Sequence, residues 1–415
     1  MEKYQLGTKE NTAFLKALQD ELLVFGTGFA SPSGASYYLG DDGRPMPGRN
    51  LETWITCRMA HVYAIGEALG FAGSEALIDA ALKGLNGVLK DTVNDGWYPA
   101  VTPDLKPLPE KQCYGHAFVI LAASSAYLAG RPGAEELLDA ATKVFLEKFW
   151  DDETGLSRDT WNTEFTELST YRGLNANMHS VEAFLSVADV TGEEIWRQRA
   201  GRIIDHVLAW AENNEWRIPE HFTENWEAAL EYNADKPDDP FKPYGATPGH
   251  GIEWGRLVTQ WALSTFRNEP EKAGPYIEKA CRLYEQAVAD GWCADGEPGI
   301  VYTTGWDGKP VVHDRMHWTL AEAINTSAVL YHVTGNQLYA DQYAQFMKYL
   351  NETVHDPVNG SWYHQLDEHN KLKETVWPGK SDIYHALQSM IIPRLDPSVS
   401  VAVAAKKGLF LEEAK

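Results

Sequence analysis

The sequence lacks the clusters of positive charge that many binding proteins use. Its 415 residues include 36 Lys and Arg against 59 Asp and Glu, which gives a formal net charge of −23, and no segment is rich in basic residues. Nucleic acids and anionic membranes attract proteins through clustered positive charge. We therefore expect neither a nucleic acid nor a membrane as partner.

Long apolar runs are also missing. The first seven residues, Met1–Gly7, contain no apolar core of the kind found in a signal peptide, and no later run of about 18 apolar residues would span a bilayer. These absences predict a cytoplasmic protein.

Cysteine is scarce and widely spaced. The four cysteines are Cys57, Cys113, Cys281 and Cys293, and no two of them have the C-x-x-C spacing of a thiolate zinc site. Their scatter predicts neither a disulfide framework nor a zinc site. We expect reduced and mostly buried thiols.

Motifs that bind common cofactors are absent too. The chain has no glycine-rich phosphate loop, no G-x-S-x-G elbow and no dinucleotide-binding fingerprint. This argues against nucleotide, serine-hydrolase and nicotinamide chemistry, and we expect no cofactor and no metal. His313 and His317 stand four apart, but they lack the glutamate of a zinc-peptidase motif, and we expect them at the surface.

Aromatic residues, by contrast, are plentiful, with 15 Trp, 19 Tyr and 14 Phe. Most of them are expected in the core, but aromatic planes beside polar groups also form a common surface for sugar rings.

Glycines mark a repeat of helices. A helix is expected at about 10–25, a loop with a short hairpin at 29–45, and a second helix from Asn50 to near Gly70. Similar helix ends follow at Gly130, Gly192 and Gly335, about 60 residues apart at first and about twice that at the end, which indicates a repeated helix pair with one degenerate copy.

Six such pairs fit the length, and the second helix of each pair has the more polar face. A closed ring would leave no end of the repeat exposed. We therefore predict an all-α fold, a single (α/α)6 barrel of helix pairs over residues 1–415, with short β-hairpins in the loops of one rim.

The segment 246–256 has the composition of a site. Thr247 is expected to cap a helix that begins at Pro248, so that His250 lies in its first turn and Glu253 shares its face one turn on. The nearby glycines should leave room for another group to approach; they are Gly249, Gly251 and Gly255.

The same spacing recurs twice. His179 is followed by Glu182, and His385 by Gln388, each at the start of an apolar helical run. A polar partner fixes the tautomer of an imidazole and tunes its basicity, as acid–base chemistry near neutral pH requires. We predict that the three histidines point from one rim into a common cavity, although most single His-x-x-Glu matches are structural.

Other polar residues are candidates for the lining of that cavity. Arg58, one turn after Trp54, would either stabilise a negative oxygen on a substrate or form a salt bridge with a glutamate. Glu322, one turn after Trp318, would orient an imidazole or accept a hydroxyl. Two further candidates begin an apolar helix after a loop, namely Tyr114 and His116.

Five motifs together resemble the N-acylglucosamine 2-epimerase superfamily, and in particular its branch of mannose and sulfoquinovose isomerases. They occur in the family's order over nearly the whole chain: Trp54-Ile-Thr-Cys-Arg-Met, Arg172-Gly-Leu-Asn-Ala-Asn-Met-His-Ser-Val-Glu-Ala, Thr247-Pro-Gly-His-Gly-Ile-Glu-Trp-Gly-Arg, Trp318-x-x-x-Glu-Ala and Asp382-Ile-Tyr-His, the last followed by Ile391-Ile-Pro-Arg-Leu.

The resemblance implies an (α/α)6 barrel that interconverts monosaccharides without a metal. It implies catalytic roles for His250 and His385, of which we assign the carbon-bound proton to His385 and the ring and hydroxyl protons to His250. The expected substrate-binding residues are Trp54, Arg58, Tyr114, Asn175, His179, Glu253, Trp318, Glu322 and Trp377.

The expected reaction interconverts D-mannose and D-fructose through a cis-enediol, and D-lyxose and D-xylulose are a further expected pair. A sulfonate would call for cationic or amide donors. The loop before Thr247 is Asp238-Asp-Pro-Phe-Lys-Pro-Tyr244, and the stretch around His364 and Ser381 lacks the amides that the resemblance implies for the sulfoquinovose branch, which favours an unmodified hexose. Alternatives are a sugar 2-epimerase acting on mannose or glucose, a sulfoquinovose isomerase, a metal-dependent isomerase, an (α/α)6 glycoside hydrolase with two carboxylates and a non-enzymatic carbohydrate-binding module. The oligomeric state is left open.

Overall fold

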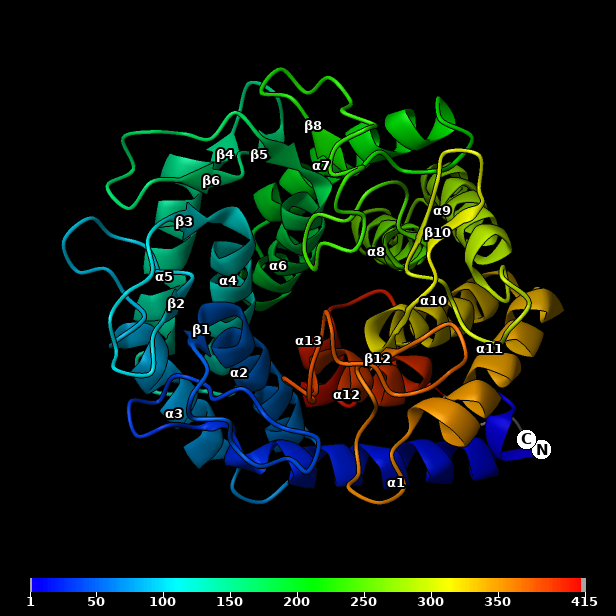
Figure 1. Ribbon diagram of the computed structural model, residues 1–415, viewed down its shortest axis with the longest axis horizontal. Coiled ribbons are helices and arrows are strands. Elements are labelled where there is room, and N and C mark those ends of the chain that lie inside the picture. Colours follow the sequence, from blue (N-terminus) through cyan, green and yellow to red (C-terminus); the bar gives the residue numbers. More distant parts are fainter. Residues whose placement is uncertain (1, 412–415) are drawn as a thin grey trace.

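Two concentric rings of helices make up the computed structural model, which describes residues 2–411 (Figure 1). The inner ring contains α2 (Thr53–Ala68), α4 (Cys113–Leu128), α6 (Leu174–Thr191), α8 (Pro248–Thr265), α10 (His317–Thr334) and α12 (Tyr384–Ile391). The outer ring contains α1 (Lys9–Phe25), α3 (Ser74–Asn86), α5 (Ala134–Val144), α7 (Ile195–Glu212), α9 (Pro270–Gly291) and α11 (Gln337–Tyr349).

The inner ring is closed. Each inner helix packs against the next along the chain, and α12 packs against α2, while each outer helix packs against one inner helix, with α1 paired to α12. The inner helices are buried on nearly every side and the outer helices only on one face, as their composition requires. The predicted (α/α)6 barrel is confirmed.

Left-handed glycines end four of the inner helices. Gly70, Gly130, Gly192 and Gly335 have φ of 83°, 67°, 77° and 68° and follow α2, α4, α6 and α10. A residue without a Cβ adopts this conformation at little cost, which explains the regular spacing. The helix α8 instead ends at Phe266 with φ of −108°, and this is the degenerate copy that the sequence indicated.

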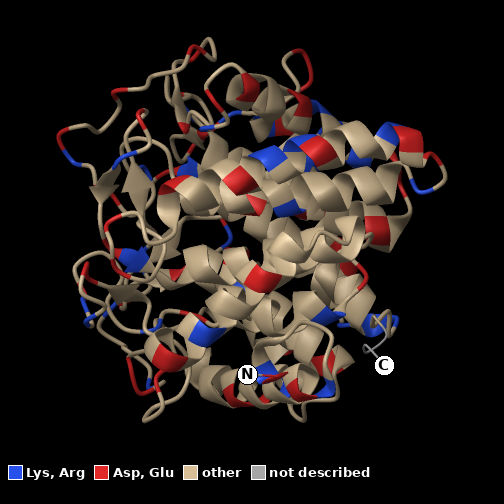
Figure 2. Ribbon diagram, turned by 90° about the vertical axis from the view of Figure 1, so that its right-hand side faces the viewer, with Lys and Arg blue, Asp and Glu red and all other residues tan. Residues whose placement is uncertain are grey.

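Short strands gather at the end of the barrel where the inner helices begin, and Figure 2 shows them with the long loops on one side of the molecule. They form two-stranded antiparallel pairs, as the predicted rim hairpins require. The strands are β1 (Leu51–Glu52), β2 (Ala100–Val101), β3 (Lys111–Gln112), β4 (Trp150–Asp151), β5 (Leu156–Ser157), β6 (Thr160–Trp161), β7 (Arg172–Gly173), β8 (His221–Phe222), β9 (Thr303–Thr304), β10 (Pro310–Val312), β11 (Arg315–Met316) and β12 (Gln365–Leu366).

Short helices cover the opposite end. The helix α13 (Val401–Lys406) packs against α2, α4 and α6, and the 3-10 helix η5 (Ile392–Arg394) packs against α10. The other short segments are the 3-10 helices η1 (Glu2–Tyr4) and η2 (Gly26–Phe29) and the π-helical turns η3 (Phe145–Phe149) and η4 (Leu350–Val354).

The glycines at the start of α8 serve helix packing. A Cβ on Gly249 would lie 2.5 Å from the Trp318 ring, one on Gly251 would lie 2.9 Å from Ala287, and one on Gly255 would lie 3.2 Å from the carbonyl oxygen of Ala280. Neighbouring helices thus occupy the space that we expected a ligand to approach. Of the three, only Gly249 bears on the pocket described below, because it lets Trp318 lie close to His250.

The expectation of free thiols is confirmed for all four cysteines. Cys57 and Cys113 are buried, Cys281 is half-buried and Cys293 is exposed, so burial is less complete than predicted. Within residues 2–411, no helix is both long enough and apolar enough to cross a membrane.

Two buried ion pairs tie the rim loops to the inner helices. Lys111 Nζ lies 2.7 Å from Asp91 Oδ2, with both side chains fully buried, and Lys380 Nζ lies 2.8 Å from Asp356 Oδ2 in the same way. Each ammonium also donates to a backbone carbonyl of the loop that carries its aspartate. The two pairs hold the starts of α4 and α12, which carry Tyr114 and His385.

Breaking one of these pairs should be costly. We expect Lys111→Met to lower the free energy of unfolding by about 3–5 kcal/mol, because it leaves Asp91 ionised and buried without a partner. The double variant Lys111→Met/Asp91→Leu should recover most of that loss, since both charges are gone. Urea unfolding followed by circular dichroism measures both. Equal stability of the single variant and the native chain would show that this pair contributes nothing.

Candidate active site

A pocket opens at the rim, where all six inner helices begin. Ten of the eleven predicted site residues line it, while Glu322 lies beneath it. The ten are Trp54, Arg58, Tyr114, Asn175, His179, His250, Glu253, Trp318, Trp377 and His385. The structure thus brings together side chains from six helices and one loop.

His385 is held in one tautomer by a carboxylate from the neighbouring helix. Its Nδ1 lies 3.1 Å from Glu322 Oε1 on α10, and its Nε2 lies 3.4 Å from Arg58 Nη2. With Nδ1 donating to the carboxylate, Nε2 keeps a lone pair and can act as a base. Burial lowers the pKa of His385, Glu322 opposes that effect and Arg58 adds to it, so the imidazole is neutral near pH 7.

Gln388, the predicted partner of His385, does not contact it. Both amide atoms of Gln388 are buried and have no hydrogen-bond partner within residues 2–411. The prediction was wrong because Glu322 on α10 lies directly beside the His385 ring and takes the place of a partner one turn along the same helix.

His250 likewise takes its carboxylate from another element. Its Nδ1 lies 3.0 Å from Glu220 Oε2, which is ion-pair distance but outside hydrogen-bond geometry, and Glu220 directly precedes β8. Glu253, the predicted partner, lies on the same helix and lines the pocket but makes no ion pair with His250. The sequence pattern therefore identified the histidine correctly but predicted the wrong acid as its partner.

His179 is the one histidine whose predicted partner is confirmed. Its Nδ1 lies 3.2 Å from Glu182 Oε2, and the hydroxyl of Tyr384 donates to the same oxygen at 2.6 Å. Burial lowers the pKa of His179 to about 4, although Glu182 opposes the shift. The ring is therefore neutral at physiological pH.

Trp318 lies between the two histidines that were predicted to be catalytic. Its ring centre is 5.0 Å from that of His250 and 6.1 Å from that of His385. The predicted common cavity thus exists, and the two imidazoles approach it from α8 and α12.

Arg58 is the cation of the pocket. Its Nη1 lies 3.4 Å from Asp382 Oδ2, and its Nη2 donates to the Tyr114 hydroxyl at 3.1 Å. Burial would lower the pKa of Arg58, but Tyr114, Asp382 and other acidic groups raise it above its ordinary value, so the guanidinium stays charged. The salt bridge that we considered therefore exists, but with an aspartate rather than a glutamate.

Beneath the pocket, Arg256 links two acids. Its Nε lies 2.8 Å from Glu322 Oε2, and its Nη2 lies 3.5 Å from Glu253 Oε1. Burial and the nearby charge of Glu322 raise the pKa of Glu253 well above its usual range, whereas Arg256 and His385 hold that of Glu322 below it despite burial. The ionised form of Glu322 is thus favoured beside His385, whereas the neutral form is favoured for Glu253.

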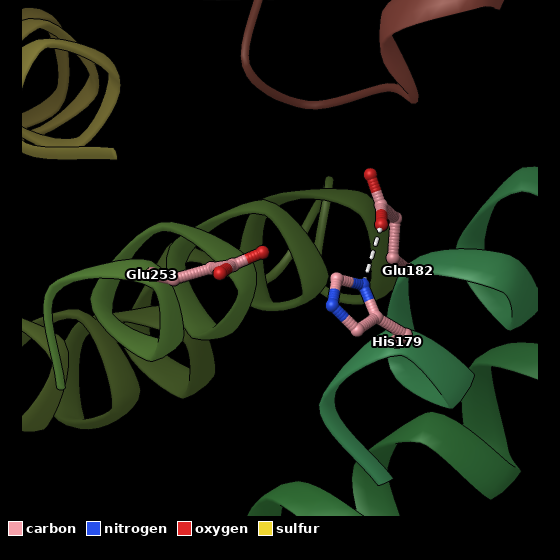
Figure 3. Close-up of side chains that lie close together, drawn as sticks. All are labelled: His179, Glu182 and Glu253. Atoms are coloured by element: carbon pink, nitrogen blue, oxygen red, sulfur yellow. Dashed lines mark hydrogen bonds and ion pairs between the residues drawn. The ribbon is translucent and has the colours of Figure 1, made fainter. Parts of the chain in front are cut away.

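One cluster has donor types that could hold a cation. His179, Glu182 and Glu253 offer ligand atoms within 4.8 Å of one another, and Figure 3 shows Glu253 approaching from α8 while His179 points its Nδ1 at Glu182. These atoms are already engaged, because Glu182 accepts from His179 and Tyr384. Arg58 and Arg256 add positive charge nearby, so the cluster suits a hydrogen-bonded acid–base group better than a metal.

Several lining residues were missed. Phe241 lies in the long loop before α8 and makes edge-to-face contacts with Trp54, Tyr114 and Trp377, with ring centres 6.2, 5.8 and 5.3 Å apart. The feature of the sequence that could have indicated this role is the position of a phenylalanine within an acidic, proline-rich loop. The others are Pro240, Pro243, Tyr302, His317, Ser381 and Asp382.

Two histidine predictions were wrong. His317 was expected at the surface, yet it is buried at the first residue of α10 and lines the pocket. His313, by contrast, is exposed as expected and pairs with Asp295. His116 was a candidate for the site, but it lies outside the pocket, where its Nε2 accepts the backbone N–H of Trp97. That bond makes His116 a structural residue.

These features are those of a helical-barrel sugar epimerase or isomerase, and the chain belongs to the N-acylglucosamine 2-epimerase family, whose sequence pattern matches residues 34–389. It is 41% identical over 395 residues to a D-mannose isomerase of Thermobifida fusca, covering 94% of this chain and 96% of that protein. It is 43% identical over 370 residues to a D-mannose isomerase of Pseudomonas cannabina pv. alisalensis, covering 88% of each. A crystal structure of a D-mannose isomerase matches with a TM-score of 0.84 and 25% identity over 92% of this chain and 97% of that one.

The carboxylate beside His385 can be tested without any substrate. We expect His385 to titrate below the ordinary imidazole pKa of about 6.5, and Glu322→Gln to lower that pKa further, because the variant loses the negative charge that stabilises the imidazolium. NMR titration of ¹⁵N-labelled histidine measures both values, and the signal is assigned by its loss in His385→Gln.

A matched control replaces an exposed rim acid. Glu368→Gln should leave the His385 titration unchanged, because Glu368 is exposed and outside the pocket. A pKa that stays the same or rises in Glu322→Gln would contradict the assigned tautomer.

Proposed function

We propose that this chain is an aldose–ketose isomerase that interconverts D-mannose and D-fructose, with D-lyxose and D-xylulose as a further pair. The observation that carries the proposal is the neutral His385, whose Nε2 faces the pocket beside the charged Arg58. The names of the relatives, which share 41% and 43% of their residues with this chain, support the same reaction.

The chemistry begins with ring opening. His250, supported by Glu220, transfers the proton between the anomeric hydroxyl and the ring oxygen of mannose, so that the open-chain aldehyde forms. Trp318, packed against both imidazoles, provides the flat surface on which the opened sugar lies.

The carbon-bound proton then moves. His385 Nε2 takes the proton from C2, the electron pair of that bond forms the C1–C2 double bond, and the carbonyl electrons move to O1, which gives a cis-enediolate. Arg58 stabilises the negative charge on oxygen in this step. His250 takes the proton of the O2 hydroxyl and passes it to O1. The proton on His385 then returns to C1 on the same face while the electrons on O2 form the C2 carbonyl, and fructose results.

The remaining lining residues have positioning roles in this proposal. Asn175, Tyr114 and Trp54 bind sugar hydroxyls and ring faces, Trp377 closes the side of the pocket next to Phe241, and His179 with Glu253 supplies a neutral donor and acceptor pair. We also propose that residues 1–415 form one catalytic domain, because the inner ring closes where α12 packs against α2, and α1 covers α12 from the outside.

A 2-epimerase is the second candidate. Two imidazoles on separate helices, each beside its own carboxylate, could also act as two bases on opposite faces of C2. Such an enzyme would convert mannose to glucose, whereas shuttling by one base yields fructose. The products of a single incubation separate the two.

The decisive assay uses deuterium. We expect the protein to convert mannose to fructose in D₂O, with deuterium appearing at C1 of fructose by NMR, because the proton that His385 takes from C2 exchanges with solvent before it is transferred to C1. His385→Gln should lower kcat/KM by about 10²–10⁴-fold, the usual contribution of a general base. Glucose as the main product would instead identify the epimerase.

The control for that variant is His116→Gln, which also replaces a buried imidazole but outside the pocket. It should keep the activity of the native chain in the fraction that folds, as judged by circular dichroism. No product from mannose, lyxose or glucose by the native chain would overturn the proposal.

A chelator tests the acid–base cluster. We expect the rate of mannose isomerisation to be the same with and without excess EDTA, because His179 is bonded to Glu182 and Glu253 is paired with Arg256. Loss of activity on chelation and its recovery with a divalent cation would place a metal in that cluster.

A further inference from the structure

At one side of the pocket, two imidazoles stack on each other. The rings of His317 and His364 are nearly parallel, with centres 3.6 Å apart and an angle of 8° between their planes. The strands β11 and β12 create this contact, because their antiparallel pairing continues through the backbone N–H of His317, which donates to the carbonyl oxygen of His364 at 3.0 Å.

The stack presents a lone pair to the pocket. His317 Nδ1 has the carbonyl oxygen of His364 as its nearest partner, at 3.4 Å, and a carbonyl only accepts. Nδ1 therefore carries the proton, and Nε2 is left as an acceptor on a residue that lines the pocket. His364 lies behind it, 1% exposed, with neither ring nitrogen bonded to any residue in 2–411.

Neither ring can readily gain a proton. Burial lowers the pKa of His317 to about 3 and that of His364 well below its usual value, and His385 and Arg58 lower both further. Lys380 acts in the same direction on His364, while Asp382 opposes the shift of His317. Two imidazoles at this separation would also repel each other if both were charged.

The charges around the stack cancel. Arg58 is the only Lys or Arg that lines the pocket within residues 2–411, and it faces the carboxylate of Asp382. Ser381, which also lines this side, donates its hydroxyl to that carboxylate. A phosphate here would meet lone pairs and a carboxylate. The one guanidinium that residues 2–411 offer to the pocket is already balanced by Asp382, so a full and permanent negative charge would lack a partner of its own in a buried site.

We propose that the stacked imidazoles of His317 and His364 form a subsite that accepts the hydroxyl of an unmodified sugar and excludes a sugar that carries a phosphate. This inference rests on the proposed function, because it concerns the sugar bound in the same pocket. His317 is then the specificity-determining residue, and His364 holds its ring in place.

Unreactive open-chain sugars test the inference by binding alone. D-mannitol and D-mannitol 1-phosphate differ only by the anionic group and cannot be isomerised. Titration calorimetry should show that the native chain binds mannitol at least about 100-fold more tightly than its phosphate, since an unbalanced charge in a buried site is strongly disfavoured.

Three variants divide the roles. His317→Gln replaces the acceptor by an amide whose N–H groups can also donate to phosphate, and it should reduce the ratio of the two affinities by about tenfold. His364→Phe keeps a flat stacking ring and should leave the ratio within about threefold of the native value. His116→Gln, a buried imidazole outside the pocket, should leave it unchanged.

The outcomes are separable. Comparable binding of the two ligands by the native chain, or an unchanged ratio in His317→Gln, overturns the inference even where mannose is converted to fructose. A His317→Gln variant that weakens both ligands equally also overturns it, because that result describes a structural role only. A native chain that neither binds mannitol nor isomerises any neutral hexose contradicts the proposed function itself.

Discussion

The arrangement of the pocket depends on the contact between each imidazole Nδ1 and a buried carboxylate. In His179 and His385 a hydrogen bond to the carboxylate also fixes the tautomer, and thereby the ring nitrogen that remains free. Two of the three carboxylates come from a different element than their histidine, so these pairs form only when those elements pack against each other. The pairs are His179 with Glu182 at 3.2 Å, His250 with Glu220 at 3.0 Å and His385 with Glu322 at 3.1 Å.

Burying so many acids requires compensation, and the structure provides it by alternating charges. Arg256 lies between Glu253 and Glu322, and Arg58 faces Asp382, so each buried cation has a carboxylate beside it. Glu253 is the exception, since burial next to Glu322 favours its neutral form. Burial likewise lowers the pKa of His179 and His385 and keeps these two rings uncharged, and neutral acids and bases are what proton transfer between sugar carbons requires.

The sequence was sufficient for the fold because the fold is encoded locally. Glycines such as Gly70 and Gly192 end helices whatever surrounds them, and their spacing gave the number of helix pairs. The histidines were also found locally, as polar groups at the starts of apolar helices. Their partners were not, because the nearest acid in space is set by which helices adjoin: Glu220 and Glu322 are 30 and 63 positions from the histidines they face. His317 and Phe241 were missed for the same reason, since the strand pairing and the loop path that bury them are long-range features.

The packing of α1 against α12 has a consequence for how the molecule is made. Helix α1 is among the first to leave the ribosome. Its neighbour α12 is synthesised only some 360 residues later. Until then, the apolar face of α1 and the flanks of α2 and α10 remain uncovered, which is the situation in which chaperones bind nascent chains. Since α12 also carries His385, the pocket receives this imidazole only in the last step of assembly, and a chain whose inner ring is not closed has neither a covered core nor a complete pocket.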